Sequence, residues 1–194
     1  MDLTKPLVHW QTRAPVTILA GTTEDVISAA EREYRETNIN KWRLFASKIE
    51  HGHKCFIAKN GFSVVGYNWI AFGSFWSGID FIVLGENEVW CSDAYTAIDW
   101  RGQGIHTALL AAMIEWARKE KYKTAYTHVS VFHPRSWKAH ERLKWHVSGL
   151  YFGIHLPRLE KQLSLAVYGS RYPIRHTIFR SQKSRRPQAI INSD

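Results

Sequence analysis

The sequence predicts a single α/β domain with a mixed, mostly antiparallel central sheet flanked by helices. Residues 54–73 form two β-rich runs joined at Asn60-Gly61, the strongest short signal for a hairpin of antiparallel strands. Residues 88–132 then follow the pattern of strand, helix and strand, which predicts a βαβ unit. A chain of 194 residues, of which 45% are hydrophobic, is long enough for one substantial core.

The first half is predicted to begin with a strand and two helices. Residues 15–20 predict a short strand. Residues 22–36 predict a helix, because a threonine cap and acidic residues precede apolar residues at helical spacing. Residues 40–50 predict a second helix, which Gly52 ends. The apolar positions are Val26, Ala30 and Tyr34 in the first helix and Trp42, Phe45 and Ile49 in the second.

The second half is predicted to supply the βαβ unit and the last strands. Residues 74–87 are an irregular aromatic stretch with room for one more strand. Residues 88–98 and 124–132 predict strands, and Pro134 starts a short helix that runs to residue 143. The helix between the two strands carries an apolar stripe of Ile105, Leu109, Met113 and Trp116. Two further strands close the series, over residues 145–154 and, with a weaker pattern, 174–180.

Composition favours a soluble globular protein. The longest apolar runs are too short to cross a bilayer, and residues 1–13 lack the build of a secretory signal, so we expect a cytoplasmic protein and no membrane partner. We expect an arm over residues 1–14, one domain over 15–180 and a basic tail over 181–194. Cys55 and Cys91 fit no metal-binding spacing, so we expect buried free thiols and no metal.

The net charge of +9 favours an acidic partner, such as nucleic acid, an anionic membrane, an acidic carrier protein or a phosphorylated cofactor. Part of the excess lies in the solvated tail, in Arg180, Lys183, Arg185 and Arg186. No recognised nucleic-acid-binding motif accompanies the charge, so we expect no nucleic-acid partner.

The segment "DWRGQG" (99–104) has the composition of an anion site. Gly102 and Gly104 separate a strand from a long helix, although glycine is a poor helix former. Glycines at this place expose successive backbone N–H groups, and the helix start adds the positive end of its dipole. A phosphate or pyrophosphate fits such a site.

The longer stretch "DWRGQGIHTALLAAMIEWA" resembles the acyl-coenzyme A loop of the GNAT superfamily of N-acetyltransferases, whose pattern is Arg/Gln-x-x-Gly-x-Gly/Ala. The resemblance covers roughly residues 15–180 and implies acetyl-CoA or another acyl-CoA as co-substrate. It implies that the loop binds the pyrophosphate and that the preceding strand pairs with the pantetheine arm beside a β-bulge. The coenzyme-binding residues implied are Ala94, Tyr95, Thr96, Arg101, Gly102, Gln103, Gly104, Ile105, His106, Thr107 and His133.

His106 departs from the family pattern, which has Gly or Ala at this position when it is counted from Arg101. Counted two residues earlier, the glycines fit and Asp99 replaces the first residue. The histone-acetylating branch also has a histidine here. His106 is therefore either a phosphate ligand or a second-turn histidine with no role.

The stretch "HPRSWKAHERLKW" resembles the second block of the family, Asn-x-x-Ala-x-x-x-Tyr-x-x-x-Gly-Phe. His133 stands at the Asn position, His140 at the Tyr position, Lys144 at the Gly and Trp145 at the Phe. The resemblance implies that His140 lies near the coenzyme sulfur as general acid, a task that suits an imidazolium. The alternative is a surface histidine in a basic helix.

A general base is also required, because an amine with a pKa near ~10 is protonated at neutral pH. Glu88 has the spacing of the base glutamate of the histone-acetylating branch. Asp93 is an acid in the middle of an apolar strand, which acids avoid unless they have a partner or a task. His128 stands on the next strand, where the ribosomal-protein-acetylating branch has its base. We rank them in this order, and water chains are a further alternative.

The resemblance implies direct transfer of an acyl group from acyl-CoA to a primary amine of a small molecule, through a tetrahedral intermediate. A catalytically silent coenzyme-binding module and an acetyltransferase of protein amines are the alternatives, and a homodimer stays open. An aromatic set either lines the acceptor pocket or fills the core. It comprises Trp69, Phe72, Phe75, Trp76, Phe81 and Trp90.

Overall fold

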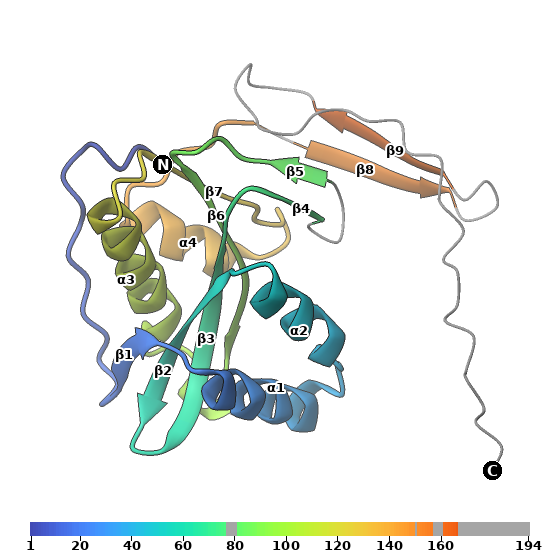
Figure 1. Ribbon diagram of the computed structural model, residues 1–194. Helices are drawn as coiled ribbons and strands as arrows, with labels where there is room; N and C mark the ends of the chain where they lie inside the picture. Colours follow the sequence, from blue (N-terminus) through green and yellow to red (C-terminus); the bar gives the residue numbers. More distant parts are fainter. Residues whose placement is uncertain (77–80, 150, 157–160, 167–194) are drawn as a thin grey trace, which may run out of the picture.

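The central sheet is mixed and mostly antiparallel, as the sequence predicts. A computed structural model describes residues 1–76, 81–149, 151–156 and 161–166 (Figure 1). Five strands follow the order β1-β2-β3-β6-β7, and every pair is antiparallel except β6–β7. The strands are β1 (Thr17–Ala20), β2 (Lys54–Asn60), β3 (Ser63–Ala71), β6 (Glu88–Thr96) and β7 (Thr124–Thr127).

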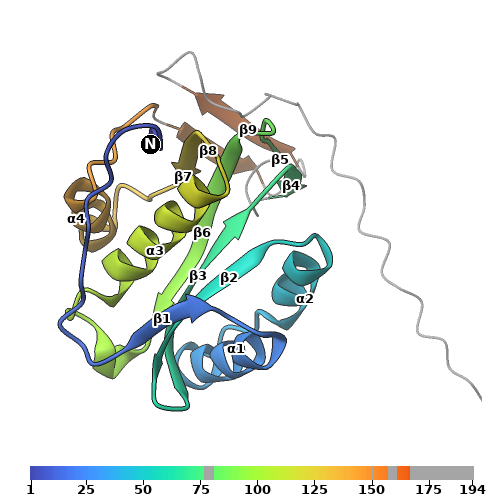
Figure 2. The same ribbon diagram turned by 60° about the vertical axis from the view of Figure 1, so that its left-hand side comes forward.

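Two layers of helices cover the sheet. Helices α1 (Thr23–Thr37) and α2 (Trp42–Glu50) lie on one face, while α3 (Ile105–Lys119) and α4 (Pro134–Arg142) lie on the other (Figure 2). Each layer has its own buried core, and the larger of the two contains the apolar stripe of α3. Trp116, at the end of that stripe, is only partly buried.

Local chemistry explains where α1 begins and where the hairpin turns. Thr22 and Asp25 form a capping box, in which each side chain bonds the other residue's backbone N–H, and this confirms the predicted threonine cap. The β2–β3 hairpin turns at Gly61 and Phe62, one residue later than predicted, because Asn60 still pairs with Ser63; Gly61 has a φ of 56°. None of the helices in the described part of the chain is long and apolar enough to cross a membrane.

The aromatic stretch holds two short strands, where the sequence suggested at most one. Strands β4 (Ser74–Trp76) and β5 (Phe81–Val83) form an antiparallel pair outside the main sheet. Near the end of the described chain, β8 (Tyr151–Leu156) pairs with β9 (Lys161–Ala166). The predicted strand over 174–180 and the basic tail lie outside the described residues.

Two predicted strand boundaries were wrong. The strand predicted over 124–132 ends at Thr127, and after it the chain turns, with Ser130 accepting hydrogen bonds from the backbone N–H groups of Phe132 and His133. The strand predicted over 145–154 begins only at Tyr151, because Lys144 and Trp145 close the end of α4. The Lys144 and Trp145 N–H groups bond the carbonyls of Glu141 and His140, as in a Schellman motif.

Lys144 has a φ of 58° in that motif, a conformation that glycine adopts more readily. It stands where the family pattern has glycine. The backbone geometry that the pattern requires is therefore kept with a lysine.

Candidate functional site

The site starts from a bulge in β6. The register between β3 and β6 shifts between Tyr67 and Trp69, so that Asp93 and Ala94 together face Asn68. Asp93 has a φ of 50°, a strained conformation for a residue with a Cβ. The structure thus contains the bulge that the family resemblance implies.

Beyond the bulge, β6 has a free edge in the described part of the structure. It pairs with β7 only over Glu88–Cys91, and no described strand pairs with residues 92–96 on that side. An extended ligand can bond to backbone groups at such an edge. Ala94 and Thr96 lie on this segment, and Tyr95 points its buried side chain toward α1.

The glycine loop follows directly on this edge. A 3-10 turn over Ile98–Trp100 leads to Gly102 and Gly104, whose φ angles are 80° and 84°. Gly104 is the N-cap of α3 and makes no side-chain cap, and the first turn of α3 has no acidic residue. The first N–H groups of this 15-residue helix and its dipole are therefore available to an anion.

The predicted loop residues have distinct surroundings. Arg101 is exposed and its Nε donates to the Thr96 carbonyl at 3.0 Å, which ties the loop to the end of β6. Ile105 and Thr107, in the first turn of α3, are buried. Gln103 and His106 are half-buried.

His106 and His140 lie together between α3 and α4. Their ring centroids are 5.8 Å apart, and the His140 ring lies 5.2 Å from that of Trp145. Burial, and to a smaller extent His140, lowers the pKa of His106 to about 4, and burial lowers the pKa of His140 as well. Both rings are therefore neutral at pH 7.

The hydrogen bonds of His140 assign its proton. Nδ1 lies 2.8 Å from the Ser136 carbonyl, which can only accept, so Nδ1 carries the hydrogen. Nε2 is buried and has no hydrogen-bond partner among the described residues. In this state Nε2 is an acceptor, and His140 is a buried residue rather than the surface histidine that the sequence left open.

His133 is the N-cap residue of α4. Its backbone carbonyl accepts hydrogen bonds from the N–H groups of Ser136 and Trp137, and its exposed side chain makes no cap. The loop before it exposes Val131 and Phe132.

The three candidate bases lie at different places. Asp93 lies at the bulge, and its Oδ2 is 2.8 Å from Nζ of Lys48. Glu88 is the first residue of β6, five residues or roughly 16 Å away from Asp93 along the strand. Its carboxylate accepts hydrogen bonds from Gly85 N–H at 2.9 Å and from the Tyr126 hydroxyl at 3.0 Å. His128 follows the end of β7 and is exposed.

Sequence reasoning missed a group of paired charges on the face covered by α1 and α2. Nζ of Lys48 also donates to the Ser92 hydroxyl at 3.2 Å and lies 5.5 Å from the Trp69 ring. The Tyr67 hydroxyl donates to Glu33 at 2.5 Å. Lys41 bonds the same hydroxyl and pairs with Glu33 at 2.9 Å.

The group continues at Tyr95, whose hydroxyl donates to Glu36. The one feature of the sequence that could have indicated this group is the i, i+3 spacing of Glu33 and Glu36, which places both acids on one face of the helix.

The aromatic residues mostly fill the core. Trp69, Phe75 and Trp90 are buried, and Phe72 stacks on Tyr122. The sequence left open whether this set lines an acceptor pocket or fills the core, and the three buried side chains fill the core. The side chains of Trp76 and Phe81 are not among those that the structure describes. Cys55 and Cys91 are buried free thiols, as expected.

The chain is similar to a known protein family. The model of the Acetyltransferase (GNAT) family matches residues 19–145. No curated protein matches the sequence.

The fold is similar to that of a transcriptional regulator from Bacillus halodurans C-125, with a TM-score of 0.56 and 18% identity over 73% of this chain and 99% of that one. It is also similar to the aminoglycoside N-acetyltransferase AAC(6')-Iy in complex with CoA, with a TM-score of 0.54 and 15% identity over 73% of this chain and 93% of that one. AAC(6')-Iy with the bisubstrate analog CoA-S-monomethyl-acetylneamine gives a TM-score of 0.55 and 14% identity over 69% and 92%. At these identities the likeness shows the fold.

Proposed function

Because the chain belongs to the GNAT acetyltransferase family, we propose that it transfers an acetyl or other acyl group from acyl-CoA to the primary amine of a small molecule. The observation that carries this proposal is the continuity of the free β6 edge with the glycine loop. One stretch of chain, residues 92–107, offers an edge for an extended pantetheine arm and then a helix start for its pyrophosphate.

In this proposal the residues named from the sequence hold the coenzyme. The backbone of Ala94, Tyr95 and Thr96 pairs with the pantetheine arm. The pyrophosphate binds at the first N–H groups of α3, around Gly104. His106 and His133 complete the edges of the site, on α3 and at the start of α4.

Asp93 is our preferred general base, ahead of Glu88 and His128. Its place at the bulge and its exposed fraction of 30% support this choice, whereas both oxygens of Glu88 already accept hydrogen bonds. In the free protein the Asp93 carboxylate pairs with the ammonium group of Lys48. The ammonium group of an acceptor carries the same charge, so it can take the place of Lys48 beside Asp93.

The reaction proceeds by direct attack. Asp93 takes one proton from the acceptor ammonium, and the amine nitrogen then forms a bond to the thioester carbon. A backbone N–H at the bulge stabilises the oxyanion of the tetrahedral intermediate. Collapse of the intermediate breaks the C–S bond.

His140 moves the remaining proton. Nε2 of His140 is an acceptor at rest, so we assign to it the uptake of the second proton from the attacking nitrogen. His140 then donates this proton to the leaving thiolate as general acid. The products are an amide, free coenzyme thiol and the proton held by Asp93.

Amino sugars are the acceptors to test first. The fold neighbour AAC(6')-Iy is named as an aminoglycoside acetyltransferase, and the partly exposed carboxylate of Asp93 suits a cationic acceptor. The test is thiol release from acetyl-CoA with a panel of amino sugars, amino acids and lysine peptides. Saturable release with a small amine supports the proposal.

Two other outcomes would contradict it. Coenzyme binding with no release on any amine favours a silent module, and release on peptides alone favours a protein acceptor.

A further inference from the structure

The N-terminal arm, residues 1–14, runs along the outside of α3 from one end of the helix to the other (Figures 1 and 2). Near its start, Leu3 is buried and its N–H bonds the Lys123 carbonyl at 2.8 Å. A bridge between Asp2 and Thr124 adds to this contact with β7. The arm is thus fixed at the end of α3 that lies far from the glycine loop.

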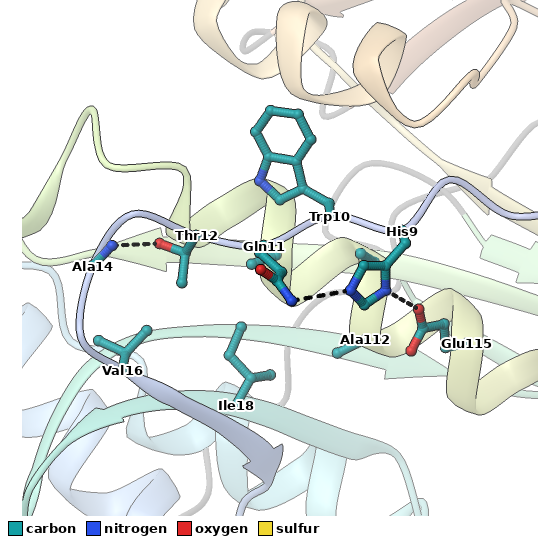
Figure 3. A pocket seen from close by; sticks show the side chains of 11 residues that line it. His9, Trp10, Gln11, Thr12, Ala14, Val16, Ile18, Ala112 and Glu115 are labelled. Atoms are coloured by element: carbon teal, nitrogen blue, oxygen red, sulfur yellow. Dashed lines mark hydrogen bonds and ion pairs between the residues drawn. The ribbon is translucent and has the colours of Figure 1, made fainter.

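At its other end the arm bonds the glycine loop itself. The Thr12 hydroxyl donates to the Gln103 carbonyl at 2.8 Å, and the Arg13 N–H donates to the same oxygen at 3.1 Å. The Ala14 N–H in turn donates to the Thr12 hydroxyl at 3.0 Å (Figure 3). This bond orients the hydroxyl toward the Gln103 carbonyl. A carbonyl oxygen has two lone pairs, and both are used here.

Between these ends the arm packs against the helix start. A Cβ on Gly104 would lie 3.3 Å from Nε1 of Trp10. The guanidinium carbon of Arg142, on α4, lies over the Trp10 ring at 5.4 Å from the ring centroid. Figure 3 shows the indole turned away from Val16 and Ile18, which line a groove of about 350 Å³ beneath the arm. Trp10 therefore links the arm to α4 as well as to the loop.

The two hydrogen bonds decide the direction of one N–H group. Gln103 lies between two glycines with positive φ, so this stretch of backbone has unusual freedom in the absence of other contacts. The peptide bond from Gln103 to Gly104 is trans and planar, so its N–H points opposite to its carbonyl. Holding the carbonyl toward the arm therefore turns the Gly104 N–H away from the arm.

We propose that Thr12 and Arg13 are positioning residues, which set the glycine loop in its anion-binding conformation before the coenzyme arrives. This inference rests on the proposed binding of the coenzyme pyrophosphate by that loop. It assigns the arm a role in coenzyme affinity, since a loop already ordered loses less conformational entropy on binding.

The test compares Thr12→Val, which removes the hydroxyl and keeps the shape, with Thr12→Ser, which restores the hydroxyl. Thr37→Val is the matched control. The half-buried Thr37 hydroxyl also donates to a backbone carbonyl, at 2.7 Å, and accepts an N–H from two residues ahead. It lies in α1, on the opposite face of the sheet.

Two readouts are needed. Hydrogen exchange of the amides of residues 102–105 in the free protein should speed up about fivefold to tenfold in Thr12→Val, the effect of losing one hydrogen bond. CoA affinity by calorimetry should weaken by a similar factor with kcat unchanged, and Thr12→Ser should restore both.

The outcomes separate the two proposals. If the parent protein binds no CoA, the proposed function fails, while hydrogen exchange still tests the arm. Parental exchange in Thr12→Val, or an equal effect of Thr37→Val on the loop, overturns the inference.

Discussion

The carboxylate of Asp93 and the ammonium group of Lys48 form an ion pair of 2.8 Å at the β6 bulge. The two partners differ in exposure, since the Lys48 side chain is 8% exposed and that of Asp93 is 30% exposed. The more exposed partner is the one that a second cation can reach. This asymmetry supports our proposal that Asp93 exchanges Lys48 for a substrate amine.

Replacing Asp93 with Asn should lower kcat by about 100-fold or more, the usual contribution of a general base. CoA affinity should change little, because the pyrophosphate loop lies further along the chain. Steady-state kinetics and calorimetry check the two effects. Glu88→Gln is the matched control, and a larger loss of kcat there than in Asp93→Asn would contradict the assignment.

Replacing His140 with Phe should slow turnover with little effect on CoA affinity. Phenylalanine keeps the ring contacts with His106 and Trp145 but cannot carry a proton. The kcat of the variant and its dependence on pH provide the measurement. Parental turnover would remove His140 from the mechanism.

Tyr67→Phe should destabilise the fold by about 1–3 kcal/mol, since it removes a buried hydroxyl that donates to Glu33 and accepts from Lys41. Urea unfolding measures the change in free energy. Tyr34→Phe, on the exposed side of α1, is the control and should lie within about 0.5 kcal/mol of the parent. Equal effects of the two substitutions would show that the charged group adds no stability.

Stability should fall as pH drops below about 6.5, because folding shields two histidines from water. Burial, followed by the charges of Lys48 and His51, lowers the pKa of His53 to about 4, and His106 is lowered to about 4 as well. The unfolded chain, with histidine pKa values near ~6.5, then binds more protons than the folded chain between pH 6.5 and 4. Each residue contributes a slope of up to about 1.4 kcal/mol per pH unit in this window and none above it.

Urea unfolding from pH 5 to 6.5 tests this, in a range above the pKa of about 4 of a free carboxyl group. His53→Gln should flatten the slope, and replacement of the exposed His133 should leave it unchanged. A slope in His53→Gln equal to that of the parent would exclude His53 as a source.

The glycine loop was predictable because its requirement is local. Positive φ angles at Gly102 and Gly104 and a helix start without acids can be inferred from residue types alone. The hairpin between residues 54 and 71 was predictable for the same reason, although its turn lies at Gly61-Phe62, one residue after the predicted pair. These features need no knowledge of what packs around them.

The roles of the acids were not predictable in this way. Counting along the sequence ranked Glu88 first, whereas our proposal of Asp93 rests on the bulge, which depends on pairing with β3, and on its partner on α2. The arm's bonds to Gln103 join residues 91 apart in sequence, and no local pattern records them. The early end of β7 likewise depends on a neighbouring strand, since β6 bulges just beyond their last pair.

CoA binding measured by calorimetry on the parent protein and on Gly104→Glu tests the central claim most directly. A glutamate at the N-cap of α3 places a negative charge where the pyrophosphate is proposed to bind. Gly61→Glu is the control, because Gly61 also has a positive φ and lies in the β2–β3 turn. We predict saturable binding by the parent and Gly61→Glu, and none by a Gly104→Glu protein whose circular dichroism remains that of the parent. Unchanged affinity in Gly104→Glu would contradict the assignment of the loop.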